Sequence, residues 1–171
     1  MSVVATACGT APTGPDLESQ PAPSLGPVEL EGSVASLEQL AFEALEGLAD
    51  GDRDRMERIR LTAYQHNVLV WPELPASAPE VNYPVDLAWA NISRRNERAV
   101  GRLLGMYEGR VLSLMSVECR DGVDEFPSFV VYRDCWVSLM VDRARVETRQ
   151  LFKYVLDWNG QHKIFRYYDP D

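Results

Sequence analysis

The sequence predicts an α+β domain in which three helices precede an antiparallel meander of four or more strands. Apolar residues recur at helical spacing as far as residue 107. After Gly109 they alternate with polar residues, and Asp121-Gly122 and Asn159-Gly160 mark turns between the alternating runs. The chain has 171 residues, of which 46% are hydrophobic and 25% are charged, so it is long enough to bury one core.

The first helix is expected over residues 36–50. Ser36 and Gln39 have the spacing of a capping box, and Gly51 follows the last apolar position as a C-terminal glycine. Glutamates occupy the opposite side of the predicted apolar face. This segment is therefore predicted to pack one side against the core and expose the other.

A second helix is expected from Asp52, which can cap it, with Met56, Ile59 and Ala63 as its apolar positions. "VLVW" at residues 68–71 is predicted as a short strand. Three prolines between residues 72 and 79 then predict an irregular extended loop.

A third helix is expected from Pro84, in its first turn, to Tyr107. Its apolar side is formed by Val85, Ala88, Ile92, Ala99, Leu103 and Met106, and its charged side, predicted to be solvated, holds Arg94, Arg95, Glu97 and Arg98.

Four long strands follow. "RVLSLMSVEC" at 110–119 alternates, and "SFVVYRDCWVSLMV" at 128–141 is rich in β-branched and aromatic residues. Asn159-Gly160 separates the last two runs, and both residues tolerate the positive φ of a type I′ turn. Asp142–Arg145 is predicted as a further turn. The strict alternation places Val111, Ser113, Met115 and Val117 on one face of the first strand.

The chain is divided into a tail at residues 1–35 and a single domain at residues 36–171. Proline and glycine are frequent between residues 9 and 35, and large apolar residues are few, so the tail is predicted to be a disordered tether. Within it, "VVATAC" places small residues directly before Cys8. This order resembles the lipobox of bacterial lipoproteins, which implies that Cys8 is the lipid anchor. The charged part of a signal peptide does not precede it, so this interpretation expects a start codon upstream. The alternative is an ordinary N-terminus with a stray thiol.

Charge excludes one class of partner. The net charge is −9, and residues 1–54 carry ten acidic residues and one basic residue. An acidic chain without a basic stripe is not predicted to bind nucleic acid, which requires clustered lysine and arginine.

No cofactor motif and no cluster of metal ligands is found in the sequence. Cys119 and Cys135 lie in predicted strands, either as buried thiols or as a disulfide formed in an oxidising compartment.

Two short helices joined at "ALEGLADGDRDRMERI", a third helix and a long meander ending in "WNGQHKIFRYY" resemble the nuclear-transport-factor-2-like, or cystatin-like, superfamily. The resemblance covers residues 36–168. It implies a curved sheet wrapped around the helices, with a cone-shaped cavity. Its residues on the cavity side are identified as Tyr64, His66, Trp89, Tyr107, Tyr132 and Trp136. These aromatic residues either line a ligand pocket or fill the cone.

His66 is the weak catalytic candidate, because an imidazole titrates near neutrality and can act as a general base. Asp86 and Asp134 are its candidate partners, and His162 is expected to be exposed after its turn. No catalytic set is complete: Arg133 and Asp134 are adjacent on a strand and therefore point to opposite faces.

The leading prediction is a non-catalytic protein of the bacterial envelope that is anchored through Cys8 and binds a partner protein or a small apolar ligand. The alternative is a small cytoplasmic enzyme of isomerase or dehydratase type that acts on a hydrophobic molecule with His66 as base. A third hypothesis is a homodimer formed through the exposed face of the sheet.

Overall fold

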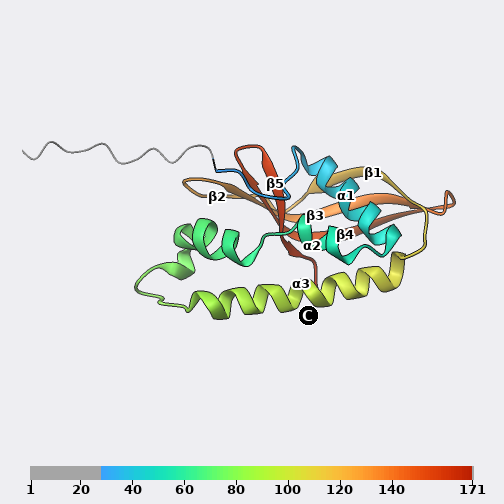
Figure 1. Ribbon diagram of the computed structural model, residues 1–171. Coiled ribbons are helices and arrows are strands. Elements are labelled where there is room, and N and C mark those ends of the chain that lie inside the picture. The colour runs from blue at the N-terminus through green and yellow to red at the C-terminus, as the bar shows by residue number, and fades with distance from the viewer. Residues whose placement is uncertain (1–27, 171) are drawn as a thin grey trace, which may run out of the picture.

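The computed structural model describes residues 28–170 and confirms the α+β class, with helices packed on an open five-stranded antiparallel sheet (Figure 1). Within this part of the chain, no helix combines the length and the apolar character needed to cross a bilayer. The elements are α1 (Leu37–Asp50), α2 (Arg53–Arg58), the π-helix η1 (Gln65–Val70), the 3₁₀ turns η2 (Trp71–Glu73) and η3 (Pro75–Ser77), α3 (Val85–Tyr107), and the strands β1 (Leu112–Cys119), β2 (Val123–Glu125), β3 (Val130–Val141), β4 (Arg145–Trp158) and β5 (Gln161–Tyr167).

The long strand β3 organises the sheet, whose order is β1-β3-β4-β5. β1 and the short β2 both pair with β3, β1 along residues 135–141 and β2 along residues 130–132. Cys119 at the end of β1 lies opposite Cys135, and the two form a disulfide. The sequence left open whether these cysteines are free thiols or a disulfide, and the pairing of β1 with β3 brings them together as a disulfide.

Two turns follow the predicted chemistry. Asn159 and Gly160 have φ values of 53° and 84°, as the β4–β5 hairpin requires. Asp142 and Arg143, between β3 and β4, also have positive φ values, of 52° and 57°. The predicted cap of α1 is present too: Gln39 N donates to the Ser36 hydroxyl at 3.1 Å, while the Gln39 side chain accepts from Ala35 N at 3.2 Å and not from Ser36 N as in a capping box.

The prediction of a strand at residues 68–71 is wrong, because the segment belongs to η1 and η2. Thr62 and Gln65 form a reciprocal cap: Gln65 N donates to Thr62 Oγ1 at 3.2 Å, and Thr62 N donates to Gln65 Oε1 at 3.1 Å. This helix start outweighs the β-propensity of the valines that follow. The second helix is also shorter than expected, since α2 ends at Arg58 and Ala63 is exposed.

The boundary predicted at residue 35 is wrong for residues 28–35, which belong to the domain. Leu30 is only 2% exposed, and Val34 forms a β-bridge with His162. The fully buried Lys163 donates from Nζ to the carbonyl oxygens of Glu31 at 2.6 Å and Arg58 at 3.0 Å. Backbone acceptors thus hold this segment in place in addition to the buried side chain of Leu30.

The strict alternation predicted for the first strand fails at Met115. The pairing of β1 with β3 shifts between Leu114 and Ser116, so one extra residue reverses the faces from there onward. Val117 and Cys119 consequently pack against the core together with Leu114, whereas Met115 is 54% exposed.

The core consists of two clusters. The larger one joins α1, α2 and the second half of α3 to β3, β4 and β5, and its largest side chains are Tyr107, Phe152 and Tyr167. The smaller one lies beneath η1 and η2, around Phe129 and Trp158. In both clusters, side chains from the helical segments pack directly against side chains of the sheet.

Candidate functional site

The structure separates the six residues predicted to line one pocket. Tyr64, directly before η1, is 67% exposed, and Tyr107 is buried in the core. Tyr132 lies near the start of β3 and contacts β4 and β5, since its hydroxyl is 3.4 Å from Asp157 Oδ2 and its ring stacks on His162. His66 and Trp89 do come together, with their ring centres 5.3 Å apart. Trp136 lies on β3 in a different place, so no common cavity joins the six.

His66 is fully buried in a cage of aromatic rings. The ring centres of Trp71, Trp89 and Phe165 lie 5.8, 5.3 and 5.9 Å from its own. Its Nδ1 is 2.6 Å from Asn67 Oδ1, and its Nε2 has no hydrogen-bond partner among residues 28–170. Burial lowers the pKa of His66 below its ordinary value, and the bond to Asn67 opposes that shift only in part.

Neither of the two acidic residues predicted as partners of His66 forms a hydrogen bond with it. Asp134 instead accepts hydrogen bonds from Lys153 Nζ at 2.6 Å and from the amide of Gln150. Asp86 is exposed in the first turn of α3. An imidazole without solvent access and without a carboxylate partner is poorly placed for general-base catalysis.

His162 is not exposed as predicted, because only 12% of its side chain is accessible. Its Nε2 lies 3.7 Å from Asp157 Oδ2, on the neighbouring strand β4. Within the described residues, no group of three His, Cys, Asp or Glu side chains converges in a way that could hold a metal ion.

A hollow of about 190 Å³ between α3, the edge of β4 and the segment after β5 combines charged and aromatic side chains. We call it the groove. Trp136 is the one sequence-predicted residue in it. Its lining consists of Arg102, Leu103, Met106, Trp136, Thr148, Arg149, Gln150 and Tyr168.

The positive charge of the groove is only partly neutralised. Arg102 donates to the backbone carbonyl of Tyr168 at 2.7 Å, an acceptor without formal charge. Arg149 shares the carboxylate of Glu147 with Arg145, so two guanidiniums meet one carboxylate. Although burial alone would raise the pKa of Glu147, hydrogen bonds from Arg149 and Tyr107 and the nearby arginine charges lower it overall. The groove therefore keeps surplus positive charge in a chain whose net charge is −9.

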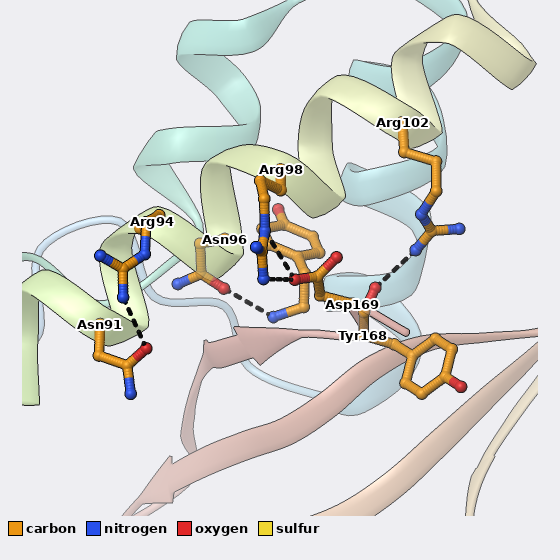
Figure 2. A network of polar contacts seen from close by, with 8 residues as sticks. Asn91, Arg94, Asn96, Arg98, Arg102, Tyr168 and Asp169 are labelled. Atoms are coloured by element: carbon orange, nitrogen blue, oxygen red, sulfur yellow. Dashed lines mark hydrogen bonds and ion pairs between the residues drawn. The ribbon is translucent and has the colours of Figure 1, made fainter. Parts of the chain in front are cut away.

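One wall of the groove is held in place by α3. Figure 2 shows Arg98 reaching the carboxylate of Asp169 and Arg102 reaching the carbonyl of Tyr168, both in the segment after β5. The Nε–Oδ2 distance in the Arg98–Asp169 pair is 3.1 Å, and Asp169 is 8% exposed. Arg98, from the predicted solvated face of α3, and Arg102, which was not part of that prediction, thus hold this segment in place.

The floor of the groove is an open sheet edge. β5 pairs with β4 only as far as Phe152 opposite Tyr167, and the last bond runs from Tyr168 N to Leu151 O. Residues 145–150 of β4 therefore have β3 as their single strand neighbour in the described part of the chain. Such an edge leaves backbone donors and acceptors unpaired on one side.

The edge of β5 is covered, in contrast. Val34 bonds His162, Ile59 and Leu61 bond Ile164, and the Asn96 side chain bonds Phe165 O at 3.4 Å and Tyr167 N at 2.8 Å. These hydrogen bonds cover the edge of β5 up to Tyr167, and the groove begins at the next residue, Tyr168.

Sequence reasoning missed Arg102, Arg149 and Tyr168, because nothing in their spacing indicates that α3, β4 and the C-terminal segment meet. Comparison with models of known protein families, with curated protein sequences and with solved structures finds no match to this chain.

Proposed function

We propose that this chain is a non-enzymatic binding protein of the bacterial envelope, and that its groove captures an extended, acidic segment of a partner protein. The segment adds to the β4 edge at residues 145–150, and its carboxylates face Arg102 and Arg149. Addition of a strand supplies affinity through backbone hydrogen bonds, while neighbouring side chains select the sequence.

The observation that carries the proposal is the coincidence of an open strand edge with surplus positive charge. Arg149 and the open backbone belong to the same stretch of β4, and Arg102 approaches from α3. Trp136 and Tyr168 add aromatic surface, which binding sites for peptides commonly use. An acidic extended segment satisfies all three features at once.

The Cys119–Cys135 disulfide supports the envelope part of the proposal, because disulfides persist in oxidising compartments and are rare in the cytosol. Cys8, the proposed lipid anchor, lies outside the described residues. Expression of the gene with its native upstream DNA tests both points: we expect an oxidised protein in the membrane fraction, released by Cys8→Ala. A reduced protein in the soluble cytoplasmic fraction contradicts the envelope assignment.

The enzyme alternative with His66 as base has less support. His66 is 0% exposed, and the aromatic rings around it fill the space that a substrate would need. The side chains of Tyr107, Phe152 and Tyr167 likewise occupy the interior. A binding role at the surface fits this packing better than chemistry in a central cavity.

The test uses two synthetic seven-residue peptides, one alternating Glu and Val and one alternating Lys and Val. Calorimetric titration into the full chain should show binding of the Glu-Val peptide alone. At saturation, hydrogen exchange of the backbone amides in residues 145–150 should slow, because the added strand pairs with them.

Arg102→Gln should lower the affinity for the Glu-Val peptide about tenfold, which is the effect of losing one charge-assisted contact. Arg94→Gln is the matched control, since Arg94 is an exposed arginine of the same helix outside the groove. Equal binding of the Lys-Val peptide, unchanged exchange at residues 145–150 or equal effects of the two substitutions would each refute the proposal.

A further inference from the structure

Residues 62–92, comprising η1, η2, η3 and the first turns of α3, form a projection at one end of the molecule that we call the apolar lobe (Figure 1). Five of the eleven strongly exposed large apolar side chains in the described part of the chain belong to it, namely Tyr64, Val68, Val81, Tyr83 and Leu87. Exposed apolar side chains that are concentrated in one part of a molecule mark interaction surfaces more often than scattered ones do.

The base of the apolar lobe is firmly packed. The ring of His66 contacts the rings of Trp71, Trp89 and, on β5, Phe165, all in tilted geometry, and the ring of Tyr83 lies 6.5 Å from that of Trp71. Val70 is fully buried. The exposed side chains are thus carried on a rigid support, which lowers the entropic cost of binding.

The charge of the apolar lobe has one sign. Residues 62–92 contain three acidic residues, Glu73, Glu80 and Asp86, and no lysine or arginine. Glu73 accepts a hydrogen bond from Ser128 N at 3.0 Å, which ties it to the fold. Glu80 and Asp86 are exposed and form no ion pair within residues 28–170, so their charges are available to a partner.

We infer that the apolar lobe is a second docking surface, which binds a partner-protein segment carrying apolar side chains flanked by lysine or arginine. Charge complementarity selects this occupant. The absence of basic residues disfavours an anionic membrane surface, which attracts lysine and arginine. The apolar lobe and the groove occupy different parts of α3, roughly 20 Å apart along the helix, so the inference does not depend on the groove being a peptide site.

The probe is an amphipathic helical peptide of Leu and Lys, with a Leu/Glu peptide of the same pattern as its counterpart. We expect the Leu/Lys peptide to bind the full chain saturably, to change the fluorescence of Trp71 and Trp89, and to bind more weakly as salt rises. The Leu/Glu peptide should not bind.

Val81→Ser combined with Leu87→Ser should lower the affinity for the Leu/Lys peptide about tenfold. Glu80→Gln combined with Asp86→Asn should remove the salt dependence of that affinity. Both apolar positions are more than half exposed, so the fold tolerates the change. Val111→Ser is the matched control, because Val111, which lies between α3 and β1 and outside the apolar lobe, is 52% exposed.

Several results overturn the inference: equal affinity for the Leu/Glu peptide, the same effect from Val111→Ser, or no binding of the Leu/Lys peptide. Partition onto zwitterionic vesicles that the double serine variant abolishes assigns the surface to lipid instead. Concentration-dependent growth in size by light scattering, abolished by the same variant, assigns it to a second copy of this chain. Either of these outcomes also rejects the basic partner.

Discussion

The side chain of Asn96 completes the hydrogen bonding of β5, because its Oδ1 accepts from the backbone N–H of Tyr167 at 2.8 Å. Its Nδ2 donates to Phe165 O at 3.4 Å, so one side-chain amide serves both a donor and an acceptor of the strand edge. Asn96 is 1% exposed on a helix whose sequence pattern gives it no role. This contact joins α3 to the sheet.

Asn96→Ala should therefore destabilise the fold by about 2–3 kcal/mol, because two buried backbone groups lose their partner. Urea unfolding followed by far-UV circular dichroism measures the loss. Asn91→Ala on the exposed side of the same helix is the control, with an expected change within about 0.5 kcal/mol. Equal losses for the two variants would show that Asn96 has no special role.

Reduction of the Cys119–Cys135 disulfide should lower the free energy of unfolding by about 2–3 kcal/mol, since the bond closes a short loop in the unfolded chain. Urea unfolding with and without reductant tests this. The Cys119→Ser, Cys135→Ser double variant should be insensitive to reductant. If two free thiols in addition to Cys8 react with an alkylating reagent in the native protein, the prediction is wrong.

His66 should make the protein sensitive to acid. Burial holds its pKa below the ordinary 6.5, so as the pH falls below 6.5 the unfolded chain takes up this proton before the folded one. The stability contributed by the neutral ring is present above pH 6.5 and is lost on acidification. His66→Phe should remove this part of the pH dependence. Parallel stability-pH curves for wild type and variant between pH 7 and 5 would contradict the assignment.

Glu147 should act in a lower pH range. Its pKa lies below the ordinary 4.5, so its stabilising contacts are complete above pH 4.5 and are lost as the pH falls through the lowered value. Glu147→Gln should cost about 1–2 kcal/mol at pH 7, because the buried Tyr107 hydroxyl and two exposed guanidiniums lose a charged partner. The difference from wild type should shrink below pH 4.5. Glu125→Gln, on an exposed position of β2, should show neither effect.

We expect Lys163 to raise the free energy of unfolding as the pH becomes alkaline. Burial lowers its pKa from 10.5 to about 8, so between these values the unfolded chain binds more protons than the folded one. Stability should rise by about 3 kcal/mol from this group over that range. Lys163→Met should lack the rise, and the slope of stability against pH distinguishes the two proteins whatever their stabilities at pH 7.

The local elements of the fold were predictable where side chain and backbone act within a few residues. Ser36 with Gln39 and the left-handed Gly51 bound α1, and Asn159-Gly160 bounds the last hairpin. The same logic could have found η1, since Thr62 and Gln65 have capping-box spacing, but the β-branched residues after them led to a predicted strand. The bulge at Met115 could not be predicted from neighbouring residues, because a bulge depends on how the strand pairs with its partner.

The candidate site could not be predicted in the same way. Arg102, Arg149 and Tyr168 are separated by tens of residues and become neighbours only when α3 crosses the end of β5. His66 and Trp89, predicted to line a cavity, instead pack against each other. Aromatic residues have the same pattern in a sequence whether they surround a space or fill it.

The sequence alone determined the α+β class, the positions of α1, α3 and the four long strands, the two turns that bound β4 and the excess of acid over base. These depend on local periodicity, turn chemistry and composition. Tertiary structure alone decided that Cys119 faces Cys135, that Asn96 covers the edge of β5 and that residues 145–150 of β4 remain open. Strand edges and cross-strand partners are set by register and by what packs alongside, and no segment encodes these by itself.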